Sequence, residues 1–195
     1  MIEPSDPIAR FAEILEQAKK TNLPEPTALV LATTDADGKP SARVVLLKEF
    51  DARGFVFYTN LESRKAIALR ANPQAALCFY WPPLYQQIRI DGTVEQVADA
   101  EADAYFASRP RGAQIGAWAS RQSAVLSSRA ELENRMKKFE EEFSGRQVPR
   151  PPFWSGFRVI PERVEFWESR ENRLHERTLY VREGERSWVI QKLYP

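Results

Sequence analysis

A series of short apolar runs with strand spacing, separated by turn signals, constrains the fold of this chain most tightly. Strand-like runs lie at 27–34, 41–48, 54–60, 74–81, 86–97, 156–160, 163–168, 173–181 and 187–193. Helical patterns at 7–22, 63–72, 99–108 and 128–143 fall between or before them. Many short strands joined by short connections predict a mainly antiparallel β-barrel or sandwich with peripheral helices. We also expect a bulge at Asp91-Gly92, because a glycine interrupts the strand pattern there.

The stretch 43–65 is the most informative of these runs. RVVLLK (43–48) and GFVFYTN (54–60) are predicted to be two strands of one hairpin, with the turn at 51–54. Ser63 is placed to cap a following helix whose first turn carries Arg64 and Lys65. Cations at a helix start oppose the helix dipole, whereas the free backbone N–H groups there suit an anion. We therefore predict a bound phosphate, the alternative being an ordinary solvated helix start.

Charge and composition exclude several classes of function. The chain carries 28 basic and 27 acidic residues, so its net charge of +1 gives no electrostatic reason to expect nucleic acid or a membrane surface as partner. No apolar run approaches the roughly 18 residues of a membrane span, and no signal peptide pattern is present, so we expect a cytoplasmic protein. One cysteine, Cys78, and one histidine, His175, allow neither an internal disulfide nor a structural zinc site.

A second cationic cluster surrounds the single histidine in ENRLHER (171–177). If this segment is a strand, alternation places Arg173, His175 and Arg177 on one face. Three cations on one face repel one another, so that face needs an anionic or polar ligand unless it meets water or acidic neighbours. The absence of a GxSxG motif argues against nucleophilic catalysis of the Ser-His-Asp kind.

Six motifs in a fixed order resemble those of the pyridoxamine/pyridoxine 5′-phosphate oxidase family. They are RVVLLK (43–48), FYTN with SRKA (57–66), YFASRPRGAQIGAWASRQS (105–123), WSGFRV (154–159), FW (166–167) and RLHER (173–177). The resemblance covers nearly the whole chain. It implies a split β-barrel that binds FMN, in one domain over 1–195 with an N-terminal helix in 1–22, a helical insertion at 99–143 and C-terminal strands at 156–195. It also implies a homodimer with two sites at the subunit interface.

The resemblance assigns roles to individual residues. It implies FMN contacts at Arg43, Val44, Val45, Leu46, Leu47, Lys48, Tyr58, Thr59, Arg64, Lys65, Gln87, Gln122, Ser123, Trp167 and Arg177. It implies substrate contacts at Lys48, Tyr105, Arg109, Arg173 and His175, the last two also being catalytic. Because Arg43 and Lys48 are five residues apart, they would lie on opposite faces of a regular strand, which suits a division between cofactor and substrate.

The implied reaction is oxidation of pyridoxine or pyridoxamine 5′-phosphate to pyridoxal 5′-phosphate, with dioxygen as electron acceptor and no metal. Two departures from the family pattern bear on substrate affinity. Ala113 stands where the family commonly has serine, so one hydroxyl hydrogen bond to the substrate phosphate is missing. The sequence begins only a few residues before Asp6, so we expect weaker closure over the substrate.

Two alternatives remain open from the sequence. One is a related FMN oxidase with another substrate, as in phenazine biosynthesis, since such proteins share RLHER-like and SRQS-like stretches. The combination of Lys48, Tyr105 and Arg109 favours the vitamin B6 substrate over this alternative. The other is a non-catalytic protein that binds flavin or pyridoxal phosphate.

Overall fold

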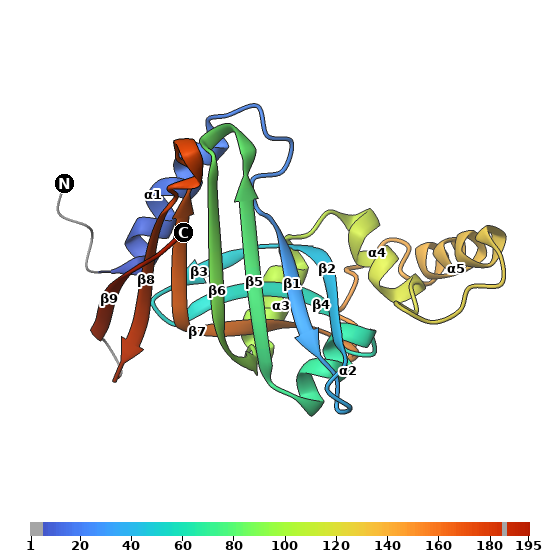
Figure 1. The fold of residues 1–195 in the computed structure, drawn as a ribbon. Coiled ribbons are helices and arrows are strands. Elements are labelled where there is room, and N and C mark those ends of the chain that lie inside the picture. Colours follow the sequence, from blue (N-terminus) through green and yellow to red (C-terminus); the bar gives the residue numbers. More distant parts are fainter. Residues whose placement is uncertain (1–5, 185–186) are drawn as a thin grey trace.

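The computed structural model describes residues 6–184 and 187–195, which form an antiparallel sheet flanked by helices (Figure 1). Its strands are β1 (Ala28–Thr34), β2 (Pro40–Leu46), β3 (Glu49–Asp51), β4 (Gly54–Asn60), β5 (Gln74–Trp81), β6 (Gln86–Gln96), β7 (Trp154–Glu168), β8 (Glu176–Glu183) and β9 (Ser187–Leu193). They follow the order β2-β1-β5-β6-β7-β4-β3, and β8 and β9 extend from β7. The predicted mainly β fold with peripheral helices is confirmed.

The sheet curls until its two ends meet where β2 leads into β3. These two strands are consecutive in the chain yet lie at opposite ends of the strand order. Between them, the backbone N–H of Leu47 donates to the carbonyl of Thr27 beside β1, at 2.9 Å. The N–H of Lys48 donates to the carbonyl of Val56 in β4, also at 2.9 Å. The chain therefore crosses between the two ends here, which gives the partly closed barrel expected of a split-barrel fold.

The predicted hairpin between residues 43–48 and 54–60 is wrong in its pairing. β2 pairs with β1, whereas β4 pairs with the short strand β3 and with β7. Glu49–Asp51 was missed as a strand because three residues carry no alternation signal. The turn at its end is as predicted, and Gly54 has φ +143° there, with the Val159 carbonyl oxygen only 2.1 Å from where a Cβ would lie.

A single strand, β7, replaces the two strands predicted at 156–160 and 163–168. Pro161 lies inside it, opposite the register shift between Asp91 and Gly92 of β6. Proline is tolerated at such a position because the ladder is already interrupted. The bulge predicted at Asp91-Gly92 is thus confirmed. The first half of β7 pairs with β4 and the second half with β8, so this strand joins both parts of the sheet.

The barrel interior is apolar and packs against the first helix, α1 (Pro7–Lys19). The helix begins as predicted after Asp6, whose carboxylate accepts a hydrogen bond from the backbone N–H of Ile8. Phe11 is fully buried, and its ring contacts Phe50, Phe55 and Phe79 at centroid distances of 5.1, 4.9 and 5.0 Å. Burying an aromatic side chain contributes about 1.5–3 kcal/mol, so α1 is part of the core.

The remaining helices are α2 (Arg64–Ala71), α3 (Asp99–Ser108), α4 (Arg111–Ala119) and α5 (Arg129–Glu142). Figure 1 shows α4 and α5 extending from one side of the sheet, opposite β8 and β9. A second apolar cluster, Phe106, Ile115, Phe143, Val148 and Trp154, packs beneath α3 to α5. Met136 and Phe139 of α5 are partly buried against this cluster. Among the described residues, no helix combines the length and hydropathy needed to cross a membrane.

Two arginines, one buried and one partly buried, fasten α3 to the barrel. Arg158 of β7 is 2% exposed and forms ion pairs with Glu101 of α3 and with Asp51 of β3. Arg150 pairs with Asp99 at 2.8 Å and with Asp103 at 2.5 Å. Because one partner on α3 is a first-turn acid in each case, these pairs also suit the helix dipole. The orientation of α3 is therefore fixed from two sides.

Candidate active site

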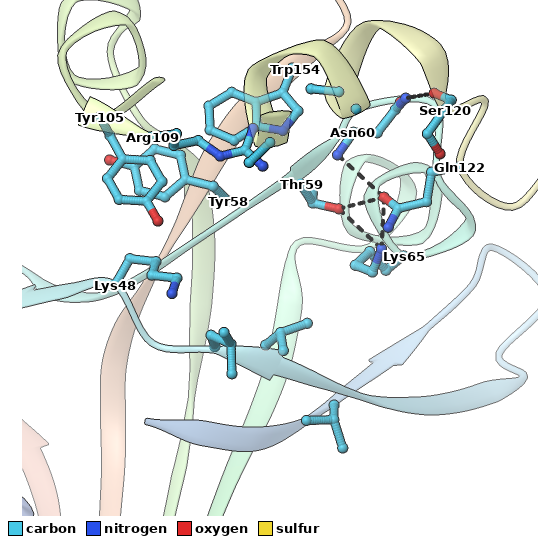
Figure 2. Close-up of a pocket in the computed structure, with 16 residues that line it drawn as sticks. Lys48, Tyr58, Thr59, Asn60, Lys65, Tyr105, Arg109, Ser120, Gln122 and Trp154 are labelled. Carbon is cyan, nitrogen blue, oxygen red and sulfur yellow. Dashed lines mark hydrogen bonds between the residues drawn. The ribbon is translucent and has the colours of Figure 1, made fainter. Parts of the chain in front are cut away.

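A cavity of about 490 Å³ opens between the end of β2, the end of β4 and helices α3 and α4 (Figure 2). It brings together many of the predicted site residues: Val44, Val45, Leu46, Lys48, Tyr58, Thr59, Lys65, Tyr105, Arg109 and Gln122. Figure 2 shows these polar side chains in two groups, with Lys48, Tyr105 and Arg109 on one side and Lys65 and Gln122 on the other. The cavity therefore presents cations at both of its ends.

Lys65 is a buried cation whose hydrogen-bond partners among the described residues are all neutral oxygen atoms. Its side chain is 8% exposed, and Nζ donates to Thr59 Oγ1 at 3.0 Å, Ser63 Oγ at 3.2 Å and Gln122 Oε1 at 3.2 Å. Burial and the nearby Arg43 lower the pKa of Lys65 to about 8. Ser63 is the predicted N-cap residue of α2, but its hydroxyl makes no capping bond because it accepts from Lys65 instead. An anion beside Lys65 would stabilise its charge.

A second cavity of about 570 Å³ adjoins the first, and Gln122 lines both. Arg43, Arg64 and Ser123 line this second cavity. Arg43 donates to Ser41 Oγ at 2.6 Å, and burial together with Arg64 lowers its pKa. The backbone N–H of Arg64, at the start of α2, donates to Ser123 Oγ at 3.3 Å. Arg43 and Lys48 thus line different cavities, but Lys48 lies beyond the end of β2, so alternation along one strand does not account for the difference.

An aromatic stack forms the wall beside Arg109. The rings of Tyr58 and Tyr105 lie 3.9 Å apart with planes 10° apart, and Trp154 stacks on Tyr58 at 5.3 Å. The Arg109 guanidinium lies 4.8 Å from the Trp154 ring centroid, and its buried Nη1 has no hydrogen-bond partner in the described part of the chain. Burial lowers the pKa of Arg109, and burial followed by Glu49 raises that of Tyr58. A buried donor without a partner suits a ligand with acceptor oxygens.

Leu47 is the exception among the predicted residues of the strand 43–48. Its side chain is 4% exposed and lies in the barrel core. It does not line either cavity described above. A ligand in these cavities would meet Leu47 only through its main chain.

The remaining predicted residues form a separate row across β6, β7 and β8. Gln87 pairs with Trp167, and Trp167 pairs with Arg177, in adjacent positions of the three strands. Arg177 donates to Glu165 Oε1 at 2.7 Å, which raises its pKa. Trp154 and Trp167 stand near opposite ends of β7, thirteen residues apart, or roughly 40 Å of strand contour. Within one chain, this row is not part of the cavity in Figure 2.

The expectation that Arg173, His175 and Arg177 share one strand face is wrong. β8 begins only at Glu176, and Arg173 lies in a short 3-10 turn with φ +62°. His175 lies just before β8, with its ring 4.7 Å from the Trp167 ring. Its Nδ1 accepts a hydrogen bond from the backbone N–H of Arg170 at 3.2 Å. His175 therefore contacts the row of Gln87, Trp167 and Arg177 through the Trp167 ring.

Sequence reasoning gave no role to several residues that line the cavity, namely Asn60, Gly116, Ala117, Ser120 and Trp154. Asn60 and Trp154 belong to motifs that carried the family resemblance, FYTN and WSGFRV. Membership in those motifs was the sequence signal that could have assigned them to the site. Asn60 positions the loop after α4, because its Nδ2 donates to the Ser120 carbonyl at 3.5 Å and its N–H donates to Gln122 Oε1 at 3.4 Å.

Comparison with known proteins agrees with this geometry. A family model described as "Pyridoxamine 5'-phosphate oxidase" matches residues 15–168, and one described as "Pyridoxine 5'-phosphate oxidase C-terminal dimerisation region" matches residues 154–195. A protein of Myxococcus xanthus named pyridoxine/pyridoxamine 5'-phosphate oxidase is 61% identical over 192 residues, which are 98% of this chain and 93% of the relative. A protein of the same name from Rubrobacter xylanophilus is 57% identical over 97% of this chain and 87% of its own length.

Two solved structures share the fold. PhzG from Burkholderia lata 383, crystallised with tetrahydrophenazine-1-carboxylic acid, superposes with a TM-score of 0.92 at 34% identity, over 98% of this chain and 94% of that one. A pyridoxamine 5'-phosphate oxidase-related, FMN-binding protein from Nostoc punctiforme has a TM-score of 0.78 at 20% identity, over 100% of this chain and 98% of that one. The sequence matches, which span almost the whole chain, identify it as a member of the pyridoxamine 5′-phosphate oxidase family.

Proposed function

We propose that this chain is an FMN-dependent oxidase that converts pyridoxine and pyridoxamine 5′-phosphates to pyridoxal 5′-phosphate, with dioxygen as electron acceptor. The observation that carries the proposal is a cavity in which Lys65 and Arg109 face one space, each without a carboxylate partner among the described residues. Two such cations at two ends suit two phosphorylated molecules, a cofactor and a substrate. The names of the relatives support the same reaction.

Family membership and the FMN-binding neighbour point to FMN as the cofactor, as the sequence predicted. We assign its phosphate to Arg43, Arg64, Lys65 and Ser123, at the start of α2. The donors there fit a phosphate ester, because they combine two guanidinium groups, an ammonium and a hydroxyl. Residues 44–48 with Tyr58 and Thr59 would contact the rest of the cofactor.

We assign the substrate phosphate to Lys48, Tyr105 and Arg109 at the other end of the cavity. Arg109 can present two parallel N–H donors to a phosphate, and Lys48 adds a point charge. Ala113 lines the same cavity, so the hydroxyl expected from the family pattern is absent. A single hydrogen bond of that kind is worth about 0.5–1.5 kcal/mol, so its loss weakens substrate binding without abolishing it.

We propose that a second copy of the chain supplies the row of Gln87, Trp167 and Arg177, together with Arg173 and His175. Within one chain this row lies away from the cavity, and a site with all predicted contacts needs both groups. The match of residues 154–195 to a dimerisation region supports this arrangement, since it includes all of these residues except Gln87. The functional unit is then a homodimer.

FMN, when bound, supplies the redox chemistry by taking up the hydride that the substrate loses. Arg173 would hold the substrate and stabilise negative charge on its ring or oxygen. His175 accepts a hydrogen bond at Nδ1, so in its neutral form the proton is on Nε2, which is then a donor. We assign His175 the role of holding the substrate through that N–H.

Purified protein tests the proposal directly. We expect a yellow preparation with a flavin spectrum that forms pyridoxal 5′-phosphate from pyridoxine 5′-phosphate in air, followed by absorbance. Replacing Arg173 and His175 should abolish turnover and leave FMN bound. A protein that is colourless and ignores added FMN would contradict the proposal.

The likeness to PhzG favours a second candidate function, oxidation of a reduced phenazine precursor. The two candidates differ in the need for a phosphate on the substrate. A protein that binds FMN, leaves pyridoxine 5′-phosphate unchanged and oxidises a tetrahydrophenazine carboxylate would establish the second function.

A further inference from the structure

Trp154 contacts side chains at the proposed substrate end of the cavity, and no role has been assigned to it so far. It is 6% exposed and is the first residue of β7. Its backbone is fixed on both sides, because its N–H donates to the Pro151 carbonyl at 3.0 Å and its carbonyl accepts from Arg150 Nη1 at 2.8 Å. Arg150 also binds Asp99 and Asp103 of α3. The indole is therefore anchored to the barrel and to α3 together.

Four side chains contact the indole ring, and three of them, Tyr58, Tyr105 and Arg109, line the cavity. Its ring plane is 5° from that of Tyr58 and 4° from that of Tyr105, with centroids 5.3 and 6.2 Å away. Phe106 meets it edge-on at 5.1 Å. The Arg109 guanidinium lies over the indole at 4.8 Å. One side chain thus contacts both Tyr105 and Arg109, which come from the end of α3 and the turn after it.

Arg109 depends on ring faces for its orientation. Its guanidinium lies over Trp154 and, at 5.6 Å, over Phe106, and no carboxylate pairs with it among the described residues. Its buried Nη1 has no hydrogen-bond partner. Fixing a flexible arginine side chain costs conformational entropy, so a stacked, pre-oriented guanidinium binds a phosphate more tightly.

We infer that Trp154 is a positioning residue that holds Arg109 and Tyr105 in the geometry that binds the substrate phosphate. The inference rests on the proposed function, because it takes these two residues to face that phosphate. Trp154 itself acts through them and makes no bond to the phosphate.

The first test compares Trp154→Leu and Trp154→Phe with Phe143→Leu, a matched loss of packing in the same apolar cluster. With FMN-loaded protein, Trp154→Leu should weaken the binding of pyridoxal 5′-phosphate and raise KM for pyridoxine 5′-phosphate, each roughly tenfold. The dissociation constant of FMN and kcat should change less than about threefold. Trp154→Phe should recover most of the affinity, because a phenyl ring still offers a face to the guanidinium.

The second test is a double-mutant cycle with Arg109→Met, read as the dissociation constant of pyridoxal 5′-phosphate. If Trp154 acts through Arg109, Trp154→Leu should weaken binding by less than about threefold once Arg109 is gone. Additive effects of the two substitutions would overturn the inference, as would equal losses in Trp154→Leu and Phe143→Leu. If Trp154→Leu does not fold, Trp154→Phe carries the same cycle with a smaller expected change, roughly threefold.

The controls separate this inference from the proposed function. If unaltered, FMN-loaded protein neither binds pyridoxal 5′-phosphate nor turns over pyridoxine 5′-phosphate, the proposed function fails and the inference fails with it. If the unaltered protein binds the phosphate and Trp154→Leu binds it equally well, only the inference fails.

Discussion

The cations of the cavity and the cations that fasten α3 to the barrel are the same residue types in opposite surroundings. Arg158 pairs with three carboxylates, Asp51, Glu95 and Glu101, and Arg150 pairs with two, Asp99 and Asp103. Lys65 and Arg109, in contrast, meet hydroxyls, an amide and aromatic rings. Burying a charge costs free energy unless the charge is paired. Carboxylates offset this cost for Arg158 and Arg150, whereas no carboxylate among the described residues offsets it for Lys65 and Arg109.

The pKa shifts follow the same division. Burial lowers the pKa of Arg43, Lys65 and Arg109, whereas hydrogen bonds to carboxylates help to raise that of Arg150 and Arg177. A ligand that brings an anion would stabilise the cations whose pKa is lowered. Arg150 and Arg177 already have a carboxylate as partner. Because Arg177 is paired with Glu165, its proposed role toward FMN is to present a neutralised, oriented guanidinium.

The largest effect we predict concerns a cation that is paired with carboxylates. Arg158→Met leaves three acids without their buried partner and should lower the free energy of unfolding by about 3 kcal/mol. FMN affinity of the folded protein should stay within about twofold. Urea unfolding and a flavin fluorescence titration measure the two quantities. Arg53→Met is the matched control, because Arg53 is exposed and shares Asp51, and it should leave the free energy of unfolding nearly unchanged.

On the unpaired side, Lys65→Met should reduce FMN affinity roughly 100-fold, since it removes a buried charge-assisted hydrogen bond to the phosphate. Lys39 lines the adjoining cavity but pairs with Asp37, so Lys39→Met should change the affinity less than about threefold. Equilibrium titration of FMN-free protein measures both constants. Equal losses in the two variants would remove the distinction between paired and unpaired cations.

Arg109→Met should raise KM for pyridoxine 5′-phosphate roughly 30-fold and leave FMN affinity within about twofold. Steady-state kinetics at saturating FMN give the first value and flavin titration gives the second. Arg111→Met serves as control, because Arg111 donates to the carbonyls of Phe143 and Arg146 outside the cavity. A loss of FMN affinity in Arg109→Met would place this residue in the cofactor group instead.

The smallest predicted effect concerns pH. The pKa of Lys65 is about 8 in the ligand-free protein, and a bound phosphate would raise it, so FMN binding takes up a proton above that pH. FMN affinity should therefore fall as pH rises above 8, by up to about tenfold per pH unit. Lys65→Arg should flatten this dependence between pH 8 and 9.5, because arginine stays charged. An unchanged slope in that variant would assign the titration to another group.

Most strands and helices could be predicted because each depends on a local pattern, whereas the three-residue strand β3 has none. The turn DADG and the alternation of 86–97, for example, indicate β1, β2 and β6 by themselves. The same turn predicts that 27–34 and 41–48 pair as a hairpin, and the pairing of β1 with β2 confirms it. The pairing of β4 with β7 joins segments far apart in the chain, so no local pattern predicted it. The extended pattern around RLHER likewise hid the turn at Arg173, which requires a positive φ.

Within the candidate site, motif order predicted the cations but not what surrounds them. Arg64 and Lys65 were predicted to face a phosphate from their place at a helix start. The three neutral acceptors of Lys65 come from β4, the residue before α2 and the loop after α4, so no local pattern joins them. The role of Trp154 was missed for the same reason, because Tyr105 and Arg109 lie far from it in the chain.

A mixed-dimer experiment tests most directly whether two copies complete each site. Lys65→Met and Arg173→Met each disable a different group of contacts, so neither homodimer should turn over pyridoxine 5′-phosphate at limiting FMN. When the two variants are unfolded together and refolded, dimers with one copy of each should contain one intact site and regain activity. If Lys65 and Arg173 served the same site from one chain, every site in the mixture would keep one lesion, and no activity would return.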